Sequence, residues 1–126
     1  MTGNRRQVMG AGFGLALTVA IRPAKGSEEA MYGLIGRMKA QPGQCDALAA
    51  ILLEGTGAMP GCLSYIVARD PADADALWIT EVWDSQASHR ASLQLPAVQA
   101  AIARGRPLIA GFDGQTETEP LGGVGL

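Results

Sequence analysis

The chain has 126 residues, of which 48% are hydrophobic, and its formal net charge is -2 at pH 7. This length and composition suit one globular domain with a hydrophobic core. The part after residue 26 holds all 12 acidic residues but only six of the 10 basic ones, which gives it a net charge of about -6. An acidic domain with scattered basic residues argues against a nucleic-acid partner.

Residues 1–26 are predicted to be a targeting segment. Residues 4–9, NRRQVM, resemble a twin-arginine export motif, and an uncharged run follows at 9–21. This run is too short, and too rich in glycine, to be a stable membrane anchor. Residues 24–26 form a candidate cleavage site, with 18–20 as the second choice. We therefore expect an exported protein, periplasmic or extracellular; the alternative is a disordered tail on a cytoplasmic protein.

The domain, residues 27–119, is predicted to begin with a strand and a helix. Residues 30–40 start apolar and then alternate, as in a strand with one partly solvated face. Pro42-Gly43 breaks this strand. From Gln44, apolar residues recur at helical spacing as far as Met59, and Gly55, Gly57 and Pro60-Gly61 provide the stop signals.

Two further strands are predicted at residues 62–68 and 76–83. A polar turn at 70–75 joins them, so they should form an antiparallel hairpin. Alternate side chains of a strand point to opposite faces. The second of these strands therefore places Glu81 and Trp83 on one face and Trp78 on the other, where it would serve the core or a dimer interface.

The remaining elements follow from capping and breaking residues. A short helix is expected at residues 86–93, with Ser85 or Asp84 as its N-cap. Pro96 suits the first turn of another helix, which runs to about Arg104. A last strand near a sheet edge is expected at 114–119. Residues 120–126 should be a flexible, glycine-rich tail unless a partner orders them.

The order β-α-β-β-α-β predicts an α+β fold of the ferredoxin-like split βαβ class, with both helices on one face of a four-stranded antiparallel sheet. The other face is left bare. A second copy of the chain is the simplest cover for it, so we predict a homodimer packed sheet to sheet.

No metal or nucleotide cofactor is expected from the motifs. The chain has one histidine, and about 20 Å of helix should separate Cys45 from Cys62, which also rules out a disulfide between them. The glycines at residues 10–14 belong to the leader and follow no strand.

Four short motifs resemble the antibiotic biosynthesis monooxygenase family. They are KAQPG at 39–43, PGCLSY at 60–65, RDP at 69–71 and EVWDS at 81–85, followed by His89. The resemblance implies a dimeric α/β-barrel. It also implies, for members that oxygenate aromatic substrates, a reaction with O2 that uses neither metal nor flavin because the substrate supplies the electrons.

The resemblance and the residues together indicate a site. By resemblance, Trp83 lines a pocket between sheet and helices. His89, whose residue type titrates near neutral pH, lies just past the strand-to-helix turn and is the candidate general base. Tyr65 is a candidate donor to a substrate oxygen, and Glu81 a candidate for orienting a donor. Family histidines found later in this region correspond to positions near Ser92 and Ala97, so proton transfer here would depend on His89.

Each of these residues also has a structural alternative. His89 would be a capping or surface residue, and Trp83 and Tyr65 would be core residues. Glu81 would form an ion pair with one of three arginines, Arg37, Arg69 or Arg90.

We predict a cofactor-independent monooxygenase that oxidises a quinol or another electron-rich aromatic small molecule with O2. The alternative is a non-catalytic dimeric module that binds a small hydrophobic ligand. Relatives that degrade haem use an asparagine with a tryptophan and a histidine, and the single asparagine here, Asn4, lies in the predicted leader. Haem degradation is therefore disfavoured.

Overall fold

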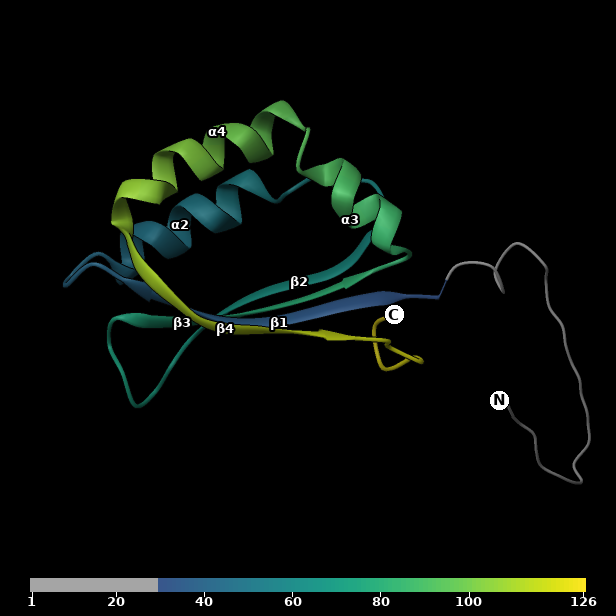
Figure 1. The fold of residues 1–126 in the computed structure, drawn as a ribbon, viewed down its shortest axis with the longest axis horizontal. Helices are drawn as coiled ribbons and strands as arrows, with labels where there is room; N and C mark the ends of the chain where they lie inside the picture. The colour runs from purple at the N-terminus through teal and green to yellow at the C-terminus, as the bar shows by residue number, and fades with distance from the viewer. Residues whose placement is uncertain (1–29) are drawn as a thin grey trace, which may run out of the picture. The chain divides into compact units, whose positions relative to one another are not determined.

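A four-stranded antiparallel sheet carries three helices on one face in the computed structural model, which describes residues 30–126 (Figure 1). In chain order the elements are β1 (Tyr32–Ala40), α2 (Cys45–Gly55), β2 (Cys62–Arg69), β3 (Ala76–Trp83), α3 (Gln86–Ser92), α4 (Pro96–Gly105), the 3-10 helix η1 (Arg106–Leu108) and β4 (Ile109–Thr118). The predicted leader lies outside the described residues. None of the helices in residues 30–126 is long and apolar enough to cross a membrane.

The sheet has the strand order β2-β3-β1-β4. All three pairings are antiparallel, with β2 and β4 at the edges. Together with the element order, this topology is the ferredoxin-like split βαβ arrangement, so the predicted α+β fold class is confirmed.

The core lies between the sheet and the helices. Its largest fully buried side chains are Leu48 of α2 with Leu77 and Trp83 of β3. Gly55 ends α2, and a Cβ built there would lie 2.4 Å from the Cβ of Ala101 in α4. A side chain at residue 55 would therefore force the two helices apart.

Local capping signals place the helices after β3. The Ser85 hydroxyl accepts a hydrogen bond from the backbone N–H of Ser88 at 3.1 Å, so Ser85 is the N-cap of α3. Pro96 occupies the first turn of α4, where its missing N–H costs no helical hydrogen bond. Both predicted helices are confirmed.

Two predictions need correction, and one pair of alternatives is narrowed. Helix α2 ends at Gly55, so Met59 lies beyond it in the following turn. Strand β4 begins at Ile109 rather than at Gly114, because Ile109 pairs with Ala40 across the sheet. Of the two roles predicted for Trp78, the core is excluded, since its side chain is 40% exposed on the face without helices, and a dimer interface stays a prediction.

The face without helices has an apolar part and a charged part. Ile35, Ile66 and Trp78 are 39%, 54% and 40% exposed there. At one end, Arg37 forms ion pairs with three aspartates, Asp70, Asp73 and Asp113. The apolar part of this face is left without a cover within residues 30–126.

Candidate functional site: a cleft between the sheet and the helices

The four predicted site residues come from three elements that meet at one end of the sheet. Glu81 and Trp83 project from β3 toward the helices, and Tyr65 of β2 pairs with Glu81 in the strand register. Because α3 begins at Gln86, only three residues beyond the end of β3, His89 returns over the strand end. The His89 ring lies 5.4 Å from the Trp83 ring and meets it nearly edge-on, at 73°.

Glu81 is held by the indole of Trp83. The Trp83 Nε1–H donates to Glu81 Oε1 at 2.9 Å, and His89 Nε2 lies 3.9 Å from the same oxygen. The longer distance is beyond a hydrogen bond, so the carboxylate lies beside the imidazole without bonding to it. The side chains of His89 and Glu81 are 20% and 14% exposed, so solvent screens this pair less than it would a surface pair.

The contacts of Glu81 and His89 differ from those expected if both had only structural roles. Arg37 and Arg69 pair with aspartates, and neither they nor Arg90 form an ion pair with Glu81 within residues 30–126. The basic side chain nearest the Glu81 carboxylate there is His89. Ser85 caps α3, and His89 is partly buried, so His89 is neither a capping nor a surface residue.

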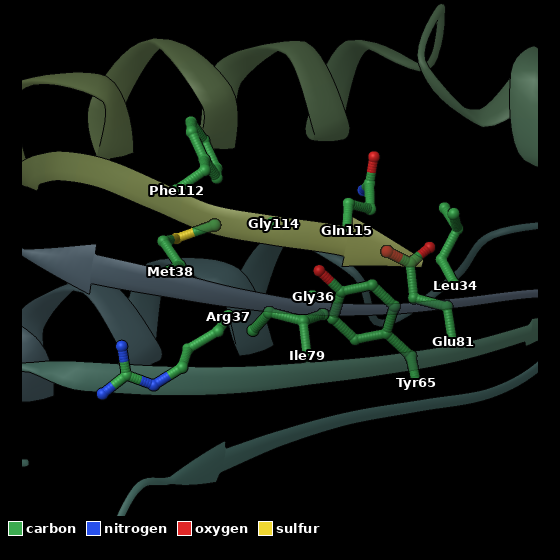
Figure 2. Close-up of a pocket in the computed structure, with 10 residues that line it drawn as sticks. All are labelled: Leu34, Gly36, Arg37, Met38, Tyr65, Ile79, Glu81, Phe112, Gly114 and Gln115. Atoms are coloured by element: carbon green, nitrogen blue, oxygen red, sulfur yellow. The ribbon is translucent and has the colours of Figure 1, made fainter. Parts of the chain in front are cut away.

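Tyr65 presents a neutral phenol to the cleft. Burial raises the pKa of Tyr65 far above its usual range, and the negative charge of Glu81 raises it further. Its hydroxyl forms no hydrogen bond with another side chain in residues 30–126, and Figure 2 shows the ring beside Glu81 on the helix-facing side of the sheet. Tyr65 is therefore suited to donate a hydrogen bond to a ligand rather than to accept a proton.

Tyr32 is a neighbour of His89 that we did not predict. The two rings lie 5.3 Å apart, and the Tyr32 hydroxyl donates to Glu117 Oε2 at 2.5 Å. This hydrogen bond stabilises the neutral phenol and is the main reason that the pKa of Tyr32 is raised. The signal that places Tyr32 here is the pairing of β1 with β3, which sets Tyr32 opposite Trp83.

Three adjoining cavities form the cleft. The His89 cavity, of about 130 Å³, is lined by all four predicted residues, Tyr65, Glu81, Trp83 and His89, together with side chains of α2 and α4. The sheet cavity, of about 300 Å³, shares Tyr65 and Glu81 with it and extends over β1 and β4 (Figure 2). The structure thus brings the predicted residues together, while their chemical roles stay predictions.

The third cavity is the largest. This Arg106 cavity, of about 550 Å³, lies between α2, α4 and β4. It shares Leu52, Ala101 and Ile102 with the His89 cavity, and Met38 and Phe112 with the sheet cavity. The His89 cavity and the Arg106 cavity are therefore neighbours along α2 and α4.

The described residues offer no obvious metal site. No group of three or more His, Cys, Asp or Glu in residues 30–126 is placed to hold a metal ion. Cys45, buried at the start of α2, and Cys62, at the start of β2, are both free thiols.

Comparison with known proteins places this chain in a family. The family profile described as antibiotic biosynthesis monooxygenase matches residues 31–104. No curated protein matches the chain.

Solved structures agree with the profile. A protein from Chloroflexus aurantiacus, provisionally described as an antibiotic biosynthesis monooxygenase, is 69% identical; the match covers 75% of this chain and 96% of that one, with a TM-score of 0.74. Two more proteins carry the same provisional description. One, from Deinococcus radiodurans, is 25% identical over 74% and 95% of the two chains, with a TM-score of 0.60. The other, from Caulobacter crescentus, is 20% identical over 75% and 92%, with a TM-score of 0.67.

The profile covers more than half of the chain, and the Chloroflexus protein is a near relative. The chain therefore belongs to the antibiotic biosynthesis monooxygenase family, and the resemblance inferred from its motifs is confirmed. The fold and the cleft support a general role in monooxygenase-like chemistry or in binding a small molecule.

Proposed function

We propose that this protein is a cofactor-independent monooxygenase, which oxidises a quinol or another electron-rich aromatic small molecule with O2. The proposal depends above all on one observation. A carboxylate held by an indole N–H at 2.9 Å lies 3.9 Å from the imidazole of His89, in a largely apolar cleft.

These groups suit the removal of a phenolic proton. In the proposed mechanism His89 accepts the proton from a substrate hydroxyl, and the negative charge of Glu81 stabilises the imidazolium that forms. Tyr65 donates a hydrogen bond to a substrate oxygen, and Trp83 forms one aromatic wall. Tyr32, whose ring lies 5.3 Å from that of His89, helps to position the imidazole.

The electrons of the reaction come from the substrate. The phenolate is oxidised by O2, a carbon–oxygen bond forms on the ring, and the O–O bond then breaks. One oxygen atom stays on the ring of the resulting hydroxyquinone, and the other leaves as water with the two hydrogens lost from the quinol. No external reductant is needed, and the apolar lining keeps bulk water from the reactive intermediate.

The test is oxygen uptake with a panel of reduced naphthoquinones, without added metal or flavin, using isotope-labelled O2. We expect one O2 consumed per quinol and one labelled oxygen atom in the product. Spontaneous quinol oxidation gives hydrogen peroxide and leaves the ring unlabelled, so the mass of the product separates the two reactions.

The variant His89→Gln should lower the enzymatic rate roughly 100-fold, the usual loss when a general base is removed. Arg90→Gln is the matched control, because Arg90 is exposed on the same helix and lines none of the three cavities. Absence of labelled product across the panel would refute the proposal, and equal rates for native protein and His89→Gln would remove His89 from it.

The second candidate function is a non-catalytic module that binds a small hydrophobic ligand in the same cleft. The apolar lining and the Tyr65 hydroxyl, which has no side-chain partner among residues 30–126, support it. Saturable quenching of Trp83 fluorescence by a quinone, with no labelled product from the quinol, would favour this candidate. The variant Trp78→Phe leaves Trp83 as the single reporter.

We also propose that a second copy of the chain covers the face of the sheet without helices. Ile35, Ile66 and Trp78 give this face an exposed apolar part that a dimer would bury. A homodimer would leave the cleft of each copy on the opposite side of its sheet, free for substrate.

Export is the proposal for residues 1–26. A fusion of residues 1–29 to a folded reporter should reach the periplasm of a bacterium with a twin-arginine pathway. Replacing Arg5 and Arg6 by Lys should hold the reporter in the cytoplasm. Equal export of both fusions would refute the twin-arginine assignment.

A further inference from the structure

The Arg106 cavity contains a single charged side chain. Ten of its eleven lining residues are apolar or glycine, and the remaining one is Arg106, at the end of α4. No carboxylate lines this cavity. A wholly apolar ligand would leave the guanidinium without an acceptor, whereas an anionic group on the ligand would give it one.

Arg106 also has no ion-pair partner in residues 30–126. Most of the other basic side chains there form ion pairs with carboxylates: Arg37, Lys39, Arg69 and Arg104. Arg90 is the other exception, but it lines none of the three cavities. Arg106 is thus the one unpaired cation placed on a cavity wall in the described part of the chain.

The length of helix α4 indicates how far Arg106 lies from the His89 end of the cleft. Val98 lines the His89 cavity, and Gly105 lines the Arg106 cavity on the same helix. Seven residues of helix correspond to about 10 Å at the α-helical rise of 1.5 Å per residue. A ligand with one ring near His89 would need its anionic group about this far from the ring to reach Arg106.

We propose that the cleft binds an elongated aromatic acid, with its ring or rings in the His89 and sheet cavities, its apolar body in the Arg106 cavity, and its carboxylate on Arg106. The inference rests on the proposed function for the identity of the reacting ring. The part of the inference that concerns the carboxylate depends only on the lining of the Arg106 cavity. Arginine suits this role because its planar guanidinium can bind a carboxylate through two parallel hydrogen bonds.

The test compares two probes of nearly equal shape, pyrenehexanoate and pyrenehexanol, by fluorescence anisotropy. The native protein should bind the acid about tenfold more tightly than the alcohol, a modest factor because Arg106 is exposed and its ion pair is screened by solvent. The preference should shrink as salt is raised, since added ions screen the ion pair.

Two variants locate the effect. Arg106→Gln should lose the preference and bind both probes as the native protein binds the alcohol. Arg104→Gln is the matched control, because Arg104 lies on the same last turn, pairs with Glu54 at 2.5 Å and does not line the cavity. It should keep the full preference. Both side chains are exposed, so neither change threatens folding.

Several outcomes would overturn the inference. Equal binding of the acid and the alcohol by the native protein would overturn it, and so would the absence of binding of either probe. An unchanged preference for the acid in Arg106→Gln would overturn it as well. Binding only by a chain that ends at Glu119 would mean that the C-terminal segment, with its exposed Leu121 and Val124, is the occupant instead. Because these measurements involve no turnover, the acid preference can hold even where quinol oxidation fails, and the reverse.

Discussion

Replacing Glu81 in two ways should separate its structural role from its chemical one. Glu81 accepts the indole N–H of Trp83, a residue that is only 1% exposed, and it also lies beside His89. Glu81→Gln keeps a carbonyl acceptor for the indole but removes the negative charge. Glu81→Leu removes both and leaves a buried donor without an acceptor.

The two variants differ in expected stability. An unsatisfied buried donor costs about 1–3 kcal/mol, so Glu81→Leu should lower the free energy of unfolding by about 2 kcal/mol. For a domain of this size, about 1 kcal/mol corresponds to 4–8 °C, which gives a fall in Tm of about 10 °C. Glu81→Gln should lose less than about 1 kcal/mol, because the hydrogen bond remains as a neutral one.

Activity should fall in both variants, because both remove the negative charge beside His89. If Glu81 stabilises the protonated imidazole, Glu81→Gln should lower the rate of quinol oxidation by about tenfold or more while the fold stays intact. Circular dichroism melting and oxygen uptake on the same samples give both quantities. Full activity in Glu81→Gln would refute a chemical role for the carboxylate, and an unchanged Tm in Glu81→Leu would refute the importance of the Trp83 hydrogen bond.

Three further predictions concern the rest of the fold. A hydrogen bond from Lys39, with further contributions from the Asp75 backbone N–H and Arg37, lowers the pKa of Asp73 to about 2 from its usual 3.8. The stability that the Lys39 contact contributes is therefore full above about pH 4 and is lost as the pH falls through 2. The difference in stability between native protein and Lys39→Met, followed by urea unfolding, should shrink steadily below about pH 4, and a difference as large at about pH 2 as at neutral pH would contradict it. Gly55→Ala should cost about 1–3 kcal/mol, because its Cβ would meet α4, and an unchanged Tm would show that the helices separate freely. Ile66→Glu should convert the proposed dimer to a monomer in analytical ultracentrifugation, whereas Leu53→Glu, an equally exposed change on α2, should not; a dimer in both variants would place the interface elsewhere.

Local signals in the sequence were enough to predict most of the fold. The bounds of β3, residues 76–83, follow from a run of strand-forming residues that ends at Asp84-Ser85, where Ser85 caps the next helix. Alternation along this strand also separates Trp83, in the core, from Trp78, on the open face. Such signals extend over only a few residues, so they can be recognised without knowledge of the tertiary structure.

The register between strands that are distant in the chain could not be predicted from the sequence. The start of β4 was missed because Gly111 and Gly114 interrupt the alternation that would mark a strand, although the pairing of Ile109 with Ala40 defines its first residue. Tyr32 was missed for the same reason, since only the register of β1 against β3 brings it beside His89. The size of the cavities likewise depends on how sheet and helices are spaced.

The sheet cavity shows how one such pairing creates space for a ligand. The register of β1 against β4 shifts between Gly36 and Met38, and Gly114, in the left-handed region at φ 110°, lies at this irregularity. Gly36 itself has no positive φ, and a Cβ there would have its nearest contact at an ordinary 3.6 Å. Neither backbone strain nor close packing therefore requires glycine at residue 36. What its missing side chain provides is room, because Gly36 lines the sheet cavity beside Tyr65 and Glu81. The cleft next to the proposed base is thus open because of residues that carry no chemistry of their own.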